Sequence, residues 1–301
     1  MPGIVMKFGG SSLKDAQRVR SVADIIEKNM KRRPFVVVSA HGGITDMLIA
    51  AARLALQGDV FGGFTNIEMR HRQIMDGLGI DHAVLAGNLR GLEELLRGIS
   101  LVKELTPRTL DFVMSYGERM SSKVVAAYLK QRGLSAVAVN AYDLGFITDA
   151  NFGGSRPLKD APERIRSAVE QYEDDLVVTT GFIGKTAAGE ITTVGRNGSD
   201  YSAAYFGAAL GVDEIQIWTD VDGVMSADPS ILPSARTIPV MSFSEASEVA
   251  YYGGQVLHPS TMTPAVEKRI PIRVLNTYHP DNPGTVIVAD GDAPADAGIG
   301  S

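Results

Sequence analysis

The sequence predicts an α/β fold built on a largely parallel sheet, and two observations support this prediction. Short runs rich in β-branched residues alternate with segments in which apolar residues recur at helical spacing, as in βαβ units. In addition, one unit of strand, glycine turn and helix occurs twice. Residues 4–8 read as a strand that leads through a glycine turn into a helix from Asp15, and residues 34–38 lead in the same way into a helix over about residues 45–56.

The alternation continues along the chain, with one interruption. Residues 61–108 show helical spacing and no strand pattern, which predicts a helical insertion or lid. Residues 176–183 and 190–194 read as two strands around a turn at 184–189, which favours a hairpin. The other expected elements are helices over 121–131, 200–210 and 262–268 and strands over 136–139, 214–219, 272–276 and 285–289. Residues 290–301, rich in Asp, Ala and Gly, read as a flexible tail.

Composition excludes several classes of protein. With 301 residues, 45% hydrophobic and 21% charged, the chain is typical of folded proteins with a sizeable core. The absence of cysteine excludes disulfide scaffolds, thiolate metal sites and cysteine nucleophiles. A formal net charge of −6 supplies no cationic field, so we expect no nucleic-acid partner. Apolar tracts such as 35–40 and 47–52 are too short to cross a membrane and residues 1–3 open no signal peptide, so we expect a cytoplasmic protein without membrane contact.

Two loops that follow strands carry the residue types of an anion site. Lys7 ends the first strand and precedes Gly9 and Gly10, whose backbone could approach a phosphate in front of a helix. A tight turn beside a solvated lysine is the alternative. Arg196 lies in a second glycine-rich loop, which opens a helix at Asp200. Arginine suits a planar carboxylate, and Asp200 either caps this helix or takes part in the site, or does both.

A third segment, residues 115–122, reads as another helix start. It places Glu118 in a first helical turn, where an acidic side chain is common and where it could also receive an ammonium group.

Taken in chain order, these loops resemble the motifs of aspartate kinases, which are members of the amino-acid kinase family. The resemblance extends from Lys7 to about residue 288, and several long motifs in the right order are far more specific than any one of them. The matching segments are residues 7–12, 36–45, 115–122, 181–184, 195–203, 217–229 and 256–259.

The resemblance implies a three-layer αβα sandwich around a mainly parallel sheet. Residues 1–289 would form the catalytic domain, with an amino-acid lobe over about 1–195, which contains the helical insertion, and a nucleotide lobe over about 196–289. The implied reaction is phosphorylation of the side-chain carboxylate of L-aspartate by ATP with Mg²⁺. Its product, 4-phospho-L-aspartate, begins the pathway to lysine, threonine and methionine.

Residue roles follow by position from the same resemblance. Thr45, Glu118, Arg196 and Ser199 would hold aspartate, with Glu118 at the ammonium and Arg196 at a carboxylate, and Ser39 would lie near the reacting groups. Lys7, Gly9 and Gly10 would stabilise the transferring phosphoryl group, and Asp200 would orient Lys7. The nucleotide site would be lined by Thr219, Asp220, Met225, Asp228, Ser230 and Gln255. We expect no protein ligand for Mg²⁺, because phosphate oxygens and water can carry the ion.

Four positions depart from the family pattern. Asn197, Met225, Ser230 and Gln255 stand where glycine, tyrosine, arginine and lysine are usual. The last three fall on the nucleotide side, so we hypothesise a remodelled nucleotide site in which Arg236 or Lys268 could replace the missing cation. Two alternatives therefore stay open: a kinase for another small carboxylate, such as glutamate or an N-acylated acid, and a weakly active or non-catalytic subunit.

The resemblance also bears on partners and regulation. Aspartate kinases commonly continue into C-terminal ACT domains, whereas only about a dozen residues follow the last expected strand here. We therefore expect either no feedback control or a separate ACT-bearing subunit, and family habit suggests a homodimer. Trp218 and residues 241–252 could join an interface, but packing in the core is the favoured interpretation.

Overall fold

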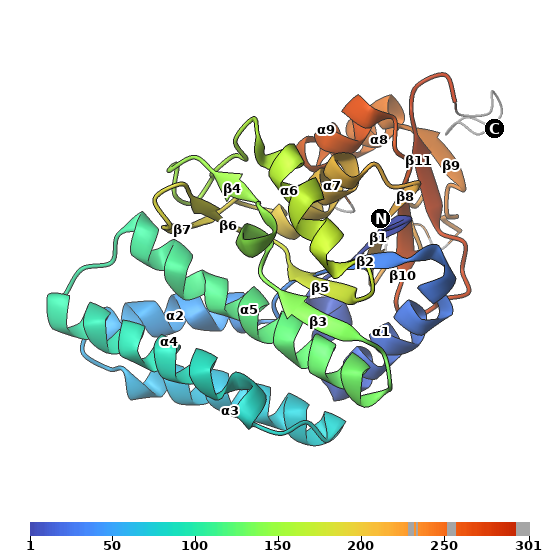
Figure 1. Ribbon diagram of the computed structural model, residues 1–301. Coiled ribbons are helices and arrows are strands. Elements are labelled where there is room, and N and C mark those ends of the chain that lie inside the picture. Colours follow the sequence, from blue (N-terminus) through green and yellow to red (C-terminus); the bar gives the residue numbers. More distant parts are fainter. Residues whose placement is uncertain (228–231, 233, 252–256, 293–301) are drawn as a thin grey trace.

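The computed structural model describes residues 1–227, 232, 234–251 and 257–292. Within these residues, eight strands form one sheet in the order β3-β5-β2-β1-β8-β10-β11-β9, and β4, β6 and β7 form a small second sheet (Figure 1). Pairing in the large sheet is parallel except between β10 and β11. Its strands are β1 (Ile4–Phe8), β2 (Pro34–Val38), β3 (Ala136–Val139), β5 (Leu176–Thr180), β8 (Glu214–Thr219), β9 (Val240–Ser242), β10 (Ile272–Asn276) and β11 (Thr285–Val288).

Strand β1 lies in the middle of the sheet, and all five of its residues are buried. Four of them are apolar, and the fifth, Lys7, pairs with an acidic side chain. It pairs with β2 on one side and with β8 on the other, both in parallel, so that Lys7 lies between Val37 and Ile217. Since side chains alternate along a strand, Ile4, Met6 and Phe8 point to one face and Val5 and Lys7 to the other.

Helices cover both faces, so the expected three-layer αβα sandwich is confirmed. Helices α1 to α5 bury their apolar sides on the face of Met6, and α6 to α9 bury theirs on the face of Val5. Each of these two cores draws side chains from strands on both sides of residue 195, so one sheet runs through both expected lobes. The helices are α1 (Ala16–Lys28), α2 (Ile44–Leu56), α3 (Phe61–Leu78), α4 (Ala83–Val102), α5 (Pro107–Gln131), α6 (Ala161–Val169), α7 (Gly198–Leu210), α8 (Phe243–Tyr251) and α9 (Pro259–Lys268).

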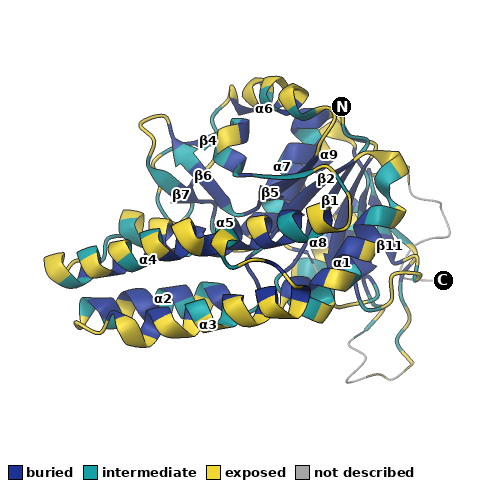
Figure 2. Cartoon of the chain, turned by 60° about the horizontal axis from the view of Figure 1, so that its bottom comes forward, coloured by how far each residue is buried: buried dark blue, intermediate teal, exposed yellow. Residues whose placement is uncertain are grey.

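The predicted helical insertion consists of α3 and α4. They lie outside α2 and α5, with exposed outer faces and buried inner faces (Figure 2). Ile67, Ile74 and Leu92 belong to the same core as β1, so the insertion packs as an outer layer of the domain.

Two expected boundaries are wrong. Residues 176–183 do not form one strand: β5 stays in the large sheet, whereas β6 (Ile183–Thr186) pairs antiparallel with β7 (Ile191–Thr193) in the predicted hairpin and in parallel with β4 (Ile147–Thr148). The break falls at Phe182, whose φ of 64° turns the chain out of the large sheet. Helix α5 begins at Pro107, where Thr106 accepts a hydrogen bond from the Thr109 N–H, so Glu118 lies inside a long helix rather than in a first turn.

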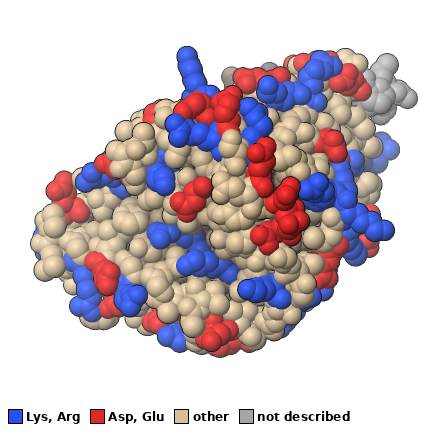
Figure 3. Space-filling view, in the orientation of Figure 1, with Lys and Arg blue, Asp and Glu red and all other residues tan. Residues whose placement is uncertain are grey.

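Of the two features expected at an interface or in the core, Trp218 lies in the core, whereas residues 241–251 are buried only in part. Trp218 is buried, stacks on Phe8 with ring centroids 6.0 Å apart, and donates its indole N–H to Gln216. The side chain of Phe243 is buried at the start of α8. None of the helices in the described residues is long and apolar enough to cross a membrane. On the face in Figure 3, basic and acidic side chains are interspersed.

Candidate active site

A cavity of about 560 Å³ opens where β1 and β2 end and α7 begins. Eight residues that the sequence assigned to the site line it together, although they come from four separate parts of the chain. They are Lys7, Gly10, Ser39, Thr45, Glu118, Arg196, Ser199 and Asp200. Open α/β sheets commonly bind ligands at this edge.

Lys7 and Asp200 form the closest ion pair in the cavity. Lys7 projects from the face of β1 that α7 covers, and its Nζ lies 2.6 Å from Oδ1 of Asp200, on the first turn of that helix. Their side chains are only 10% and 15% exposed, so water screens the pair weakly. Asp200 is not the cap of α7, because Asn197 takes that position without a side-chain hydrogen bond. Asp200 therefore lies at the cavity, paired with Lys7, and not at the cap position of the helix.

Glu118 is a buried carboxylic acid without a cationic partner among the described residues. Its Oε1 accepts the Ala40 N–H at 3.1 Å, and its Oε2 has no hydrogen-bond partner. Burial raises the pKa of Glu118 to about 8, against the lowering effect of the Ala40 N–H. The approach depends on Gly117, since a Cβ there would lie 2.7 Å from that of Ala40. The free protein therefore presents an acid that an incoming ammonium group would ionise.

The opposite wall is the beginning of α7. Ser199 packs against Gly181, where a Cβ would lie 2.7 Å from the Ser199 Cβ, so the start of the helix sits directly on the end of β5. Asn197 has a φ of 53°, a left-handed conformation that explains why glycine is usual there and why asparagine is tolerated. Arg196 precedes it and is exposed at the cavity. A helix N-terminus beside an arginine favours an anion.

The loop after β2 closes a third side. The Ser39 N–H donates to the Phe8 carbonyl, and His41 is buried with its Nδ1 2.7 Å from the Leu13 carbonyl. Burial lowers the pKa of His41 to about 3, and that of the neighbouring His71 on α3 to about 4. Both rings are therefore neutral near pH 7. His41 contacts the Leu13 carbonyl and the ring of His71, so it links the loop to its neighbours without a charge.

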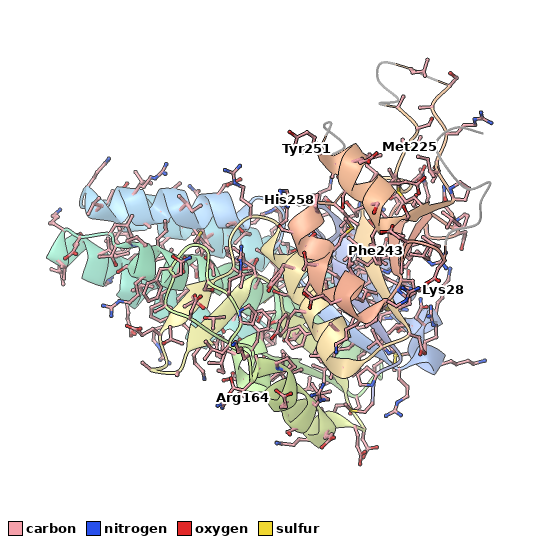
Figure 4. The ribbon with its side chains drawn as sticks, turned by 90° about the horizontal axis from the view of Figure 1, so that it is seen from above. Lys28, Arg164, Met225, Phe243, Tyr251 and His258 are labelled. Atoms are coloured by element: carbon pink, nitrogen blue, oxygen red, sulfur yellow. The ribbon has the colours of Figure 1, made fainter. Side chains whose placement is uncertain are left out.

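The predicted nucleotide residues are not brought together to the same extent. Gly9, Thr219, Asp220 and Met225 lie outside the lining of this cavity. The backbone N–H of Gly9, which was expected near the transferring phosphoryl group, donates to the Trp218 carbonyl at 3.2 Å. Met225 faces Thr237 and lies at the end of the molecule opposite α3 and α4 (Figure 4). Asp228, Ser230 and Gln255 lie outside the described residues, and Arg236 and Lys268 are exposed.

Sequence reasoning did not assign several lining residues to the site, among them Asp46, Met114, Gly153, Phe182 and Thr193. Phe182 fell inside a segment interpreted as one strand, and its turn is visible only in the backbone. Thr193 ends β7 of the hairpin, three residues before Arg196. This closeness in sequence to a predicted site residue was the available signal. No cluster of three or more His, Cys, Asp or Glu side chains in the described part of the chain could hold a metal ion.

Comparison with known families settles the relationship. The model of the amino acid kinase family matches residues 2–276. The chain belongs to this family. Its relatives in the family include the chloroplastic aspartokinase 2 of Arabidopsis thaliana, 42% identical over 96% of this chain and 55% of that protein, and the lysine-sensitive aspartokinase 3 of Escherichia coli (strain K12), 33% identical over 94% and 64%.

A solved structure of this kinase family shows the same architecture. E. coli aspartokinase III in complex with aspartate and ADP superposes with a TM-score of 0.87 at 31% identity, over 97% of this chain and 65% of that one. The chain spans about half the length of the plant relatives that it matches.

Proposed function

We propose that this chain carries the catalytic region of an aspartate kinase, which transfers the γ-phosphoryl group of ATP to the side-chain carboxylate of L-aspartate. The observation that carries the proposal is the convergence of the Lys7–Asp200 ion pair, the buried Glu118 and Arg196 on one cavity. Similarity to a kinase structure that holds aspartate and ADP supports this choice of substrates.

The charges of the cavity suit the charges of aspartate. Glu118 would lose its proton and pair with the ammonium group as a carboxylate, which would give it the cationic partner that the described residues do not supply. Arg196, with Ser199 and the start of α7, would hold a carboxylate by charge-assisted hydrogen bonds. Glutamate is one methylene longer, and an N-acylated acid has no ammonium group for Glu118, so both fit the cavity less well.

The chemical step needs positioning more than proton transfer. A carboxylate is ionised at neutral pH, so its oxygen attacks the γ-phosphorus directly while the bond to the bridging oxygen breaks and ADP leaves. Lys7 would stabilise the charge on the transferring group, and Asp200 would keep its Nζ in place. Mg²⁺ would bind mainly through phosphate oxygens and water.

A coupled ADP-release assay with L-aspartate, L-glutamate and N-acetyl-L-glutamate tests the proposal. Hydroxylamine identifies the product, because an acyl phosphate is trapped as a hydroxamate. Activity with aspartate supports the proposal, and activity only with another acid favours the alternative substrate. If the folded protein releases no ADP with any of the three acids, the result favours a non-catalytic subunit, the alternative suggested by Met225, Ser230 and Gln255. Lys31→Ala, at an exposed lysine of the β1–β2 connection, is the matched control for Lys7→Ala.

We also propose, from family habit, that the chain forms a homodimer. Sedimentation of the purified chain tests this statement. A monomer at micromolar concentration would contradict it.

A further inference from the structure

Asp111 is a buried carboxylate on α5 that lies outside the cavity lining. Its residue is 1% exposed, and it takes part in no ion pair found among the described residues. It accepts three hydrogen bonds instead: Oδ2 from the N–H groups of Gly153 and Thr193, both at 2.9 Å, and Oδ1 from the Thr193 hydroxyl at 2.8 Å. A carboxylate without a cation is costly to bury, and burial raises the pKa of Asp111 against these three donors.

The donors belong to the two chain segments that form the far wall of the cavity. Gly153 and Thr193 both line it, and the Ser155 N–H donates to the Thr193 carbonyl, so the two segments are hydrogen-bonded to each other. Arg196 follows Thr193 by three residues. Asp111 is therefore hydrogen-bonded to the stretch of chain that leads to Arg196.

On its own helix, Asp111 precedes Glu118 by seven residues, or about two turns and roughly 10 Å of helix. Both side chains lie on the same side of α5, because seven residues return to nearly the same direction. Another polar link from α5 to the hairpin, the ion pair of Arg108 and Glu190, is largely exposed and contributes little.

We propose that Asp111 is a positioning residue that fixes the separation between Glu118 and Arg196, and through it the affinity for aspartate. This inference rests on the proposed function, since these two residues are taken to hold the ammonium and a carboxylate of one molecule. Asp111 touches neither substrate, so its loss acts on aspartate binding and leaves the nucleotide side unchanged.

Asp111→Ala and Asp111→Asn separate this role from general support of the fold. Asparagine can keep its carbonyl oxygen at the two backbone N–H groups, and its amide can donate to the Thr193 oxygen once that hydroxyl rotates. Alanine removes all three contacts. Thr106→Ala is the matched control, because it weakens the same helix at its cap without touching Gly153 or Thr193.

The wild type is assayed first, and its failure to use aspartate counts against the proposed function alone. If it is active, we expect Asp111→Ala to raise the KM for aspartate about 10- to 100-fold, with the KM for ATP within about 2-fold. Asp111→Asn and Thr106→Ala should stay within about 3-fold of the wild type. Asp111→Glu keeps the charge but lengthens the link by one methylene, and it should also raise the KM for aspartate, which preserves the test if the alanine variant does not fold. An unchanged KM in Asp111→Glu, or equal changes in Asp111→Ala and Thr106→Ala, would overturn the inference.

Discussion

Replacing Glu118 by Gln removes one titrating group from the cavity and keeps an oxygen for the Ala40 N–H, now 3.1 Å from Oε1. With a pKa of about 8, this acid is about nine-tenths protonated in the free protein at pH 7. An ammonium group binds the ionised form, so aspartate binding at pH 7 should release ~0.9 proton per molecule. In Glu118→Gln this release should be absent.

The same pKa has a consequence for stability. The folded protein holds a proton on Glu118 that the unfolded chain loses near 4.5, so the contribution to folding is full below pH 4.5 and is lost as pH rises through 8. The difference between these two pKa values corresponds to a change of roughly 5 kcal/mol in the free energy of unfolding, as an upper bound. Bound aspartate should remove most of this loss, because its ammonium stabilises the charged form.

Isothermal titration calorimetry at pH 7 measures the proton release. The binding enthalpy is compared in buffers of different ionisation enthalpy, and the slope gives the number of protons. A slope indistinguishable from zero in the wild type, with measurable binding, would refute the assignment of Glu118 to the ammonium. An equal slope in Glu118→Gln would refute it as well.

Four further predictions follow from particular contacts. Lys7→Ala should lower kcat at least about 10²-fold without unfolding the protein, whereas Lys31→Ala should not; equal activity would contradict the role of the ion pair. Gln255→Lys should raise ATP affinity or turnover, and unchanged values would remove the hypothesis of a remodelled nucleotide site. Gly284→Ala should cost roughly 3 to 5 kcal/mol of unfolding free energy, because its Cβ would overlap the Val274 carbonyl oxygen, while Gly133→Ala, with a similar positive φ and open space, should cost about 1. The buried imidazoles of His41 and His71, which face Arg70, have pKa values below that of an unfolded histidine, so the free energy of unfolding should fall by roughly 4 kcal/mol between pH 7 and 5. Glu118 changes the free energy of unfolding in the opposite direction over this interval. Chemical denaturation should therefore show that Glu118→Gln loses more stability in acid than the wild type.

The sequence predicted most of the fold because buried parallel strands carry a continuous apolar signal. The five residues of β1 and of β2 are all buried, and their boundaries were found correctly. The start of α5 was missed because Gly117, which resembles the entry to a helix, is small for another reason: it lets Glu118 reach the backbone of Ala40. The true start, Thr106 with Pro107 at the first helical position, carried a clear capping signal.

The site was less predictable because its geometry comes from packing between distant segments. The pairing of Lys7 with Asp200 depends on which face of β1 is covered by α7, and no local pattern states this. Asp111 was missed for the same reason. Its position on α5 is regular, but its partners Gly153 and Thr193 become neighbours only when the hairpin of the second sheet folds onto the helix.

The cavity lies where the two cores of the molecule meet, and this explains why its charged residues come from both. Glu118 belongs to a helix of one layer, whereas Asp200 belongs to a helix of the other, and β1 between them supplies Lys7. An ammonium held by one layer and an anion held by the other would be fixed relative to each other only if the layers themselves are fixed. The large sheet provides that rigidity through β1 and β8, and Asp111 adds a direct link between α5 and the wall that carries Arg196. In the proposed kinase, substrate alignment would therefore depend on how the layers are joined, and variants at these contacts should change aspartate affinity even where they touch no substrate atom.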